Sequence, residues 1–220
     1  MDHDASEWPG MRRGLMCPRS GREYPKQMES FLVSTGVVAL AEIGDKTQLL
    51  AFVLAARFRK PWPIIAGILV ATLFNHAAAG AAGAWLMHVI GPDWLRWILG
   101  VSFLAMAAWT LIPDSIDDDE LKSAKRSWGV FGTTLVAFFL AEMGDKTQLA
   151  TIALAAKYAA PVDVVLGTTL GMMIANVPAV FLGEHLLKRV PMRLVHGVAA
   201  ALFAVLGVLT LVGAGARFGF

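Results

Sequence analysis

Cysteine and charge are both scarce in this sequence. Of its 220 residues, 16% are charged and one is a cysteine, Cys17. A single cysteine excludes an intramolecular disulfide, and Cys17 lies outside every apolar run, away from the partners that a metal or redox role needs. Because 56% of the residues are hydrophobic and the mean hydropathy is +0.59, the chain has more apolar surface than one soluble core can bury. The composition predicts a protein whose natural solvent is a lipid bilayer.

Two further absences narrow the function. The net charge is only +2 and the basic residues are scattered between apolar runs, which excludes a nucleic-acid-binding surface. Residues 1–30 are polar and lack the apolar stretch of a secretory signal. We interpret 1–30 as a disordered tail. Because Met28 opens a short lead into the first apolar run, the alternative is that translation starts at Met28 and that 1–27 is an upstream mis-start.

The apolar residues form six stretches, each near the roughly 20 residues that a helix needs to cross about 30 Å of hydrocarbon. Prolines, glycines and charged residues separate the stretches. The sequence therefore predicts an all-α integral membrane protein with six transmembrane helices at 31–56, 63–90, 94–112, 129–156, 162–187 and 193–214.

A ten-residue segment occurs twice, at 40–49 and at 140–149, with nine of the ten positions identical. We call these segments the two motif copies. Each copy belongs to a unit of three expected helices, and an odd number of crossings makes the second unit enter the membrane from the opposite side. The chain is thus predicted to consist of two inverted three-helix repeats, 31–112 and 129–214, joined by a charged linker at 113–128 and followed by a short tail at 215–220.

Basic residues concentrate in the first, third and fifth expected loops: Arg57, Arg59, Lys60, Lys122, Lys125, Arg126, Lys188, Arg189 and Arg193. By the positive-inside rule these loops are cytoplasmic, and both termini are outside. The acidic run within the linker lacks the glycine and the spacing of a calcium-binding EF-hand loop, so we interpret it as a solvated connection.

Acidic residues in the middle of two apolar stretches are the strongest functional signal. Counted from Phe31 at about 1.5 Å per residue, the acids of the first copy lie about 16 to 21 Å into the membrane. Each costs about 3 kcal/mol to insert, so a function or a partner is expected. Spacing of three places both acids of a copy on one helix face, and the intervening glycine lets facing helices approach. We call these residues the motif acids: Glu42, Asp45, Glu142 and Asp145.

Carboxylate oxygens without thiolates favour hard cations such as calcium, magnesium and manganese over zinc or copper. Four motif acids and the neighbouring Lys46 and Lys146 sum to a charge of minus two, which one divalent cation or two protons would neutralise. This charge balance predicts an exchange of metal for protons, with the lysines as charge-balancing groups. The alternative is that each lysine forms an ion pair with the glutamate four residues before it and merely ties the helices together.

Other polar residues of the apolar stretches are additional candidates. Gln48 and Gln148 would offer amide oxygens as ligands or form hydrogen bonds between helices. Asn75 and His76 occupy places in the second stretch that nearly match that of Asn176 in the fifth, and His76 would relay protons or supply a nitrogen ligand that favours manganese.

Thr47 and Thr147 are expected to bond to carbonyls of their own helices. Pro178 removes a helix hydrogen bond and is expected to kink the fifth stretch.

The duplicated pattern of Glu, an apolar residue, Gly, Asp, Lys and Thr resembles the signature of a cation/proton exchanger family that includes bacterial manganese exporters and Golgi manganese and calcium transporters. The resemblance extends from Met28 to the C-terminus. It implies export of manganese, or of calcium, from the cytoplasm in exchange for protons, with metal-binding roles for the four motif acids. It also implies a non-enzymatic protein without a cofactor, and its compact length favours a bacterial inner-membrane type.

Two other functions fit parts of the pattern. A passive divalent-cation channel also uses carboxylates as a filter, and would differ by lacking a response to an imposed pH gradient. An intramembrane aspartyl protease carries a Gly-x-Gly-Asp motif in a membrane helix. Here glutamate replaces the first glycine in both copies, and a protease does not require the same charged pattern twice.

Overall fold

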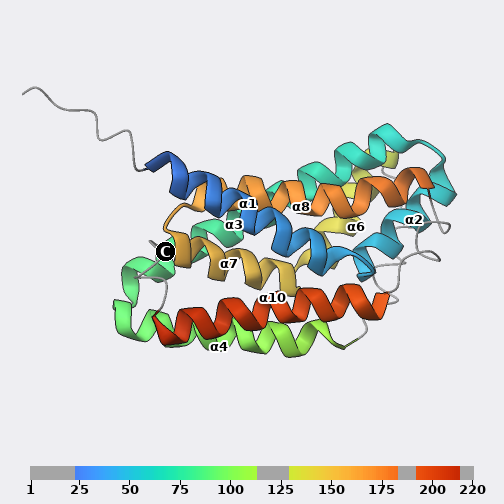
Figure 1. The fold of residues 1–220 in the computed structure, drawn as a ribbon. Helices are drawn as coiled ribbons and strands as arrows, with labels where there is room; N and C mark the ends of the chain where they lie inside the picture. Colours follow the sequence, from blue (N-terminus) through green and yellow to red (C-terminus); the bar gives the residue numbers. More distant parts are fainter. Residues whose placement is uncertain (1–22, 113–128, 183–191, 214–220) are drawn as a thin grey trace, which may run out of the picture.

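The structure, a computed structural model, describes residues 23–112, 129–182 and 192–213. The regular structure of these residues is entirely helical (Figure 1). The predicted linker and C-terminal tail, and residues 1–22 of the predicted N-terminal tail, lie outside the described residues. Residues 23–30, predicted to belong to the disordered tail, instead form the first turns of a helix. The helices are α1 (Glu23–Glu42), α2 (Lys46–Phe58), α3 (Pro61–Val89), α4 (Pro92–Thr110), α6 (Gly129–Glu142), α7 (Lys146–Tyr158), α8 (Pro161–Leu182) and α10 (Met192–Val212).

Several helices have the length and composition of membrane spans. Among the described residues, α3, α8 and the Arg193–Val212 part of α10 are long and apolar enough to cross a bilayer. Two shorter apolar stretches, Trp94–Thr110 and Gly129–Glu142, accompany them. Large apolar side chains on the outside of the bundle, such as Phe74 and Val212, agree with a lipid-facing surface.

The sequence predicted continuous helices for the first and fourth spans, but both are interrupted in the structure. Each is broken at its motif copy, into α1 and α2 at residues 43–45 and into α6 and α7 at residues 143–145. Gly44 and Gly144 adopt φ angles of 86° and 78°, a left-handed conformation that residues with a Cβ atom avoid. The predicted role of Gly144 in close packing is wrong, since a Cβ atom there would meet nothing within 4 Å. Its role is to turn the backbone.

The broken helices run in opposite directions through the bundle. In Figure 1, α1 and α2 lead away from the end at which α1 begins, whereas α6 and α7 lead back towards it. The chain enters α1 and leaves α10 at the same end. Next to the broken helices lie the antiparallel helices α3 and α8, with α3 packed on α6 and α7, and α8 packed on α1 and α2. Each of these helices therefore lies against the motif copy that is distant in sequence.

Glycines make these contacts close, in two equivalent places. A Cβ atom on Gly67 of α3 would lie 3.0 Å from the carbonyl oxygen of Phe131, and one on Gly167 of α8 would lie 2.5 Å from that of Phe31. Both glycines and both phenylalanines are 100 residues apart. No side chain fits between these backbones, and glycine at both places lets the helices approach closely.

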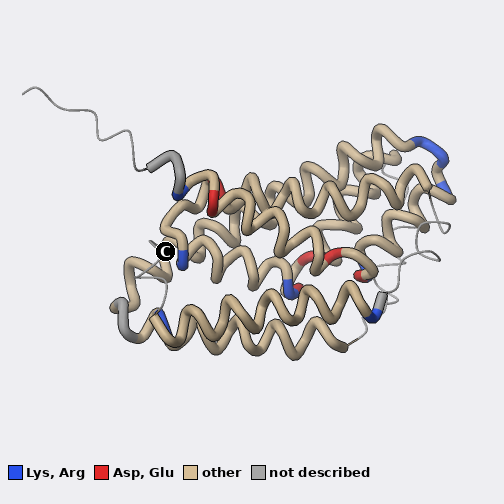
Figure 2. The backbone as a smooth tube through the Cα atoms, in the orientation of Figure 1, with Lys and Arg blue, Asp and Glu red and all other residues tan. Residues whose placement is uncertain are grey.

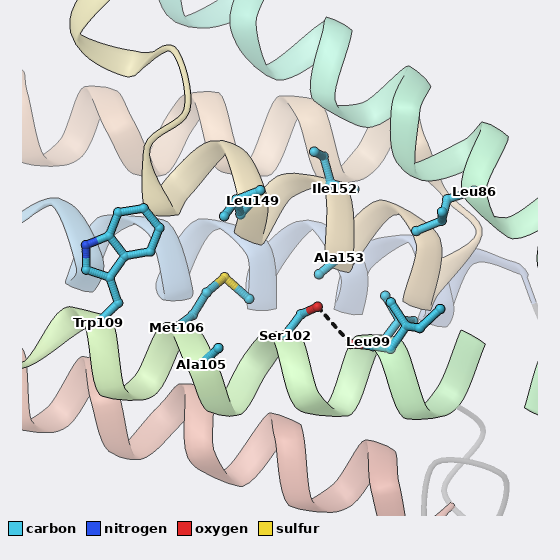
Figure 3. A pocket seen from close by; sticks show the side chains of 10 residues that line it. Leu86, Leu99, Ser102, Ala105, Met106, Trp109, Leu149, Ile152 and Ala153 are labelled. Atoms are coloured by element: carbon cyan, nitrogen blue, oxygen red, sulfur yellow. Dashed lines mark hydrogen bonds between the residues drawn. The ribbon is translucent and has the colours of Figure 1, made fainter. Parts of the chain in front are cut away.

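The helices α4 and α10 form a separate pair at one side of the bundle (Figure 1). Phe103 and Phe203 are fully buried where this pair meets the rest of the molecule. An apolar cavity of about 190 Å³ lies between α3, α4 and α7 (Figure 3). The hydroxyl of Ser102 in its wall donates to the carbonyl oxygen of Ile98 in the same helix, 2.7 Å away. No charged side chain lines this cavity, so it offers nothing to hold a cation.

Candidate metal centre

Charged residues of the described part of the chain are confined to two kinds of place along the backbone. Most lie near the ends of the bundle, while one group lies in its interior, where α1–α2 and α6–α7 are broken (Figure 2). The interior group consists of the four motif acids with Lys46 and Lys146. Because a charge inside a membrane bundle is costly, its concentration at one place identifies the candidate functional site.

Three of the motif acids come together as one compact cluster. Glu42, Glu142 and Asp145 are buried, and one carboxylate oxygen from each lies within 4.8 Å of the others. The cluster joins the end of α1 to the end of α6 and the start of α7. Asp45, the fourth motif acid, is also fully buried and is bonded to Lys146. Three carboxylates at this spacing can surround a single cation.

The helix breaks position the acids. Glu42 is the last residue of α1 and Asp45 is the N-cap residue of α2, with extended backbone angles. The second copy repeats this geometry with Glu142 and Asp145. The predicted reason for their proximity, a shared face of one helix, is wrong because the helix is interrupted between them. The carbonyl-bearing ends of α1 and α6 meet here, and the partial negative charge of helix C-termini favours a cation.

The motif threonines hold the glutamates. The hydroxyl of Thr47 donates to Oε2 of Glu42 at 2.5 Å, and that of Thr147 donates to Oε2 of Glu142 at 3.1 Å. The sequence-based expectation that these hydroxyls bond to their own helix carbonyls is therefore wrong. In a continuous helix, residues five apart point to different sides. The left-handed glycine interrupts the helix and changes the direction in which the following side chains point, which brings the hydroxyl and the carboxylate together.

The second oxygen of each glutamate remains available. Oε1 of Glu42 and Oε1 of Glu142 are buried and have no hydrogen-bond partner among the described residues. A buried polar atom without a partner is unfavourable by about 1 to 3 kcal/mol, and more when it is charged. An ion bound between the glutamates would satisfy both oxygens.

The two lysines link the motif copies to each other. Lys146 of the second copy forms a buried ion pair with Asp45 of the first. Lys46 of the first copy lies 3.9 Å from Asp145 of the second. Both links cross from one copy to the other, which the predicted pairing within a single helix did not anticipate. Both lysines therefore lie beside aspartates of the site.

The motif glutamines close the helix breaks. Oε1 of Gln48 accepts a hydrogen bond from the backbone N–H of Gly44 at 2.9 Å, and Oε1 of Gln148 accepts one from Gly144 at 2.8 Å. The amide nitrogen of Gln48 also donates to the carbonyl oxygen of Ala175 in α8 at 2.9 Å. These oxygens accept from the residue before the N-cap, whereas in a capping box the side chain at this position accepts from the N-cap residue itself.

The remaining candidates lie on α3 and α8. Asn75 donates to the carbonyl oxygen of Phe139 near the end of α6, at 3.1 Å, and Asn176 donates to that of Met172 in its own helix, at 3.1 Å. His76 is fully buried, and neither of its ring nitrogens has a hydrogen-bond partner in the described part of the chain. Pro178, where we predicted a kink, lies inside α8, which is assigned as one helix from Pro161 to Leu182.

A cluster of buried carboxylates at breaks in the helices of a membrane bundle is the arrangement expected of a cation transport protein. The comparison with known proteins agrees with this class. The chain belongs to the family described as "Divalent cation/proton antiporter GDT1", which it matches over residues 30–118 and 130–217. The two matched segments each contain one motif copy, and the family is one of transporters rather than enzymes.

Several relatives are similar over most of their length. The chain is 50% identical over 184 residues to the "Putative manganese exporter" of Vibrio cholerae, an alignment that covers 83% of this chain and 90% of that protein. It is 27% identical to GDT1-like protein 5 of Arabidopsis thaliana, with 84% and 96% of the two chains covered. A GDT1-like protein of Synechocystis is also 27% identical, with 83% and 97% covered. No solved structure matches the chain.

Proposed function

We propose that this protein exports a divalent cation, manganese in the first place and calcium in the second, from the cytoplasm in exchange for protons. The observation that carries the proposal is the buried cluster of Glu42, Glu142 and Asp145, whose oxygens lie within 4.8 Å of one another. Such a cluster without a cation would place several negative charges in a low-dielectric interior. The name of the Vibrio cholerae relative supports manganese.

The proposed architecture is six crossings arranged as two inverted repeats, 31–112 and 129–214. It is supported by the equivalent breaks at Gly44 and Gly144, by the opposite directions of the broken helices, and by the matching contacts of Gly67 and Gly167. The protein would lie in the bacterial inner membrane with both termini outside. In agreement, Figure 2 has the basic α2–α3 turn at the end opposite to the start of α1.

The cation would be held near the middle of the membrane by the motif acids. Their donors are all oxygens, which suits a hard divalent ion. Thr47 and Thr147 would fix the rotamers of the glutamates, because each hydroxyl occupies one oxygen and leaves the other for the ion. His76 and Asn176 carry buried polar atoms without partners in the described residues, and we assign them to proton relay or to additional ligation.

Charge balance supports exchange rather than passive flow. The four motif acids and the two lysines sum to minus two, so one divalent cation makes the site neutral. Two protons would do the same after the cation leaves. Alternation between these two neutral forms would avoid a highly charged intermediate in the membrane interior, where charge is costly.

The proposal is tested with the purified protein in liposomes. An outwardly or inwardly directed pH gradient should drive manganese against its own gradient, with saturable flux. We expect Glu42→Gln, Glu142→Gln and Asp145→Asn each to reduce this flux by about a hundredfold or more, since each removes a charged ligand. Asp163→Asn is the matched control, because this carboxylate lies in the first turn of α8, away from the cluster.

Three results would contradict the proposal. Full activity in the three cluster variants would exclude the cluster as the cation-binding site. Flux that neither saturates nor responds to the pH gradient would indicate a channel instead. Cleavage of a membrane peptide that is lost in Asp45→Asn alone would indicate a protease.

A further inference from the structure

Lys46 and Lys146 occupy equivalent positions of the two motif copies but have different surroundings. The side chain of Lys146 is 2% exposed and forms an ion pair with Asp45, which is 0% exposed. The side chain of Lys46 is 17% exposed and lies 3.9 Å from Asp145. One lysine is thus inserted into the interior and the other stands at its edge, although both follow the same sequence.

This difference determines which carboxylates are grouped for a cation. The compact cluster contains Asp145 but not Asp45. Asp45 is instead bonded to the Lys146 ammonium, which is itself a cation inside the site. In this conformation the three motif acids that can hold a cation are Glu42, Glu142 and Asp145, and Asp45 is the one paired with Lys146.

Resting on the proposed function and its inverted repeats, we propose that Lys46 and Lys146 act as alternating internal cations that assign the metal to one set of ligands in each transport state. In the conformation described here, Lys146 neutralises Asp45, and the metal binds to Glu42, Glu142 and Asp145. In the opposite conformation Lys46 neutralises Asp145, and the metal binds to the same two glutamates together with Asp45.

The reason is the symmetry of an inverted repeat. When such a transporter opens to the other side, its two repeats exchange their local conformations. The surroundings of Lys146 then become those of Lys46, and the reverse. Both glutamates remain ligands in both states, so the ion need not leave them. In the described conformation both lysines lie near an aspartate of the other copy, Lys146 in the interior and Lys46 at its edge. Exchanging these two places moves no charge into or out of the site, so its total charge stays the same.

Four double variants test this pairing at constant composition. Two remove a cross-copy pair: Asp45→Asn with Lys146→Gln, and Asp145→Asn with Lys46→Gln. Two remove the same kinds of residue from a single copy: Asp45→Asn with Lys46→Gln, and Asp145→Asn with Lys146→Gln. Each loses one acid and one base, so all four have the same net charge. Manganese binding is measured in detergent from the electron paramagnetic resonance of free Mn²⁺, and exchange is measured in liposomes.

We expect each cross-copy variant to retain one complete three-carboxylate set. Its dissociation constant for Mn²⁺ should stay within about fivefold of the wild type, while exchange falls by at least tenfold because the second state is lost. Each single-copy variant leaves a buried charge without its partner in one state and lacks a ligand in the other. Its binding should weaken on the order of a hundredfold.

Equal binding in the two classes of double variant would overturn the proposal, and so would normal exchange in both cross-copy variants. If the wild type itself neither binds nor exchanges manganese, the proposed function fails instead. Should a double variant not remain monodisperse, thermal unfolding of the single variants decides. Lys146→Gln, which removes the buried partner of Asp45, should lower the unfolding midpoint more than Lys46→Gln, and equal losses would contradict the pairing.

Discussion

The two motif copies differ at only one of ten positions, yet they do not have the same environment. In the first copy, Gln48 is buried and bonded to α8, and the backbone at Gly44 is partly covered. In the second copy, Met143 is 58% exposed and Gly144 is exposed as well. The same local sequence therefore produces the same break in both helices, while the neighbouring helices decide how deeply each break is buried.

The largest difference between the copies is expected for the lysines. Lys146→Met removes the partner of a fully buried aspartate and should destabilise the protein by about 3 kcal/mol, whereas Lys46→Met, at the edge of the site, should cost about 1 kcal/mol. The measurement is the midpoint of thermal unfolding in detergent without metal. Lys146→Arg should recover part of the loss, because it keeps the charge. Equal destabilisation by the two methionine variants would mean that the copies are energetically alike.

A smaller difference is expected for the glutamines. Gln48→Leu removes hydrogen bonds to Gly44 and to Ala175, whereas the side chain of Gln148 makes only the bond to Gly144 within the described residues. With about 1 kcal/mol for each bond, Gln48→Leu should be about 1 kcal/mol more destabilising than Gln148→Leu. Chemical denaturation monitored by tryptophan fluorescence would measure this difference. A greater loss of unfolding free energy for Gln148→Leu than for Gln48→Leu would contradict this expectation.

No difference is expected for the glycines. Gly44→Ala and Gly144→Ala should each cost about 1 to 2 kcal/mol, because both positions have a positive φ angle that a Cβ atom opposes. Gly36→Ala is the control: it lies within α1, a Cβ atom there meets nothing within 4 Å, and alanine should stabilise the helix by about 0.5 to 1 kcal/mol. A stabilising Gly144→Ala would show that the break is not strained.

Composition and periodicity were sufficient to predict an all-helical membrane protein, and the acids themselves were visible as charges in apolar stretches. The family membership was also predictable, because the duplicated motif is specific. In each case the signal lies in residue type and spacing, which do not depend on tertiary contacts.

The helix breaks were not predicted, although each motif copy contains the residues that cause them. Gly followed by Asp, with Gln three residues later, is a stop and a new start for a helix. The break is not evident from the sequence because the surrounding apolar run is long enough for a continuous span. The hydroxyl bonds of Thr47 and Thr147 to the glutamates depend on the breaks and were missed for the same reason.

The cross-copy ion pairs could not be predicted from the sequence. Lys146 and Asp45 are 101 residues apart, and their contact depends on how α3 and α8 place the two breaks against each other. Local spacing favoured a lysine–glutamate pair within one helix. Tertiary packing instead brings each lysine to the aspartate of the other copy.

The interlocked packing of α3 and α8 has a consequence for biosynthesis. Asp45 is made before its partner Lys146, and α3 enters the membrane before α6 and α7, the helices that it contacts. The pair can therefore form only after the second motif copy has been synthesised. The candidate site is completed only after the second motif copy has been made, and neither half on its own contains all of its acids.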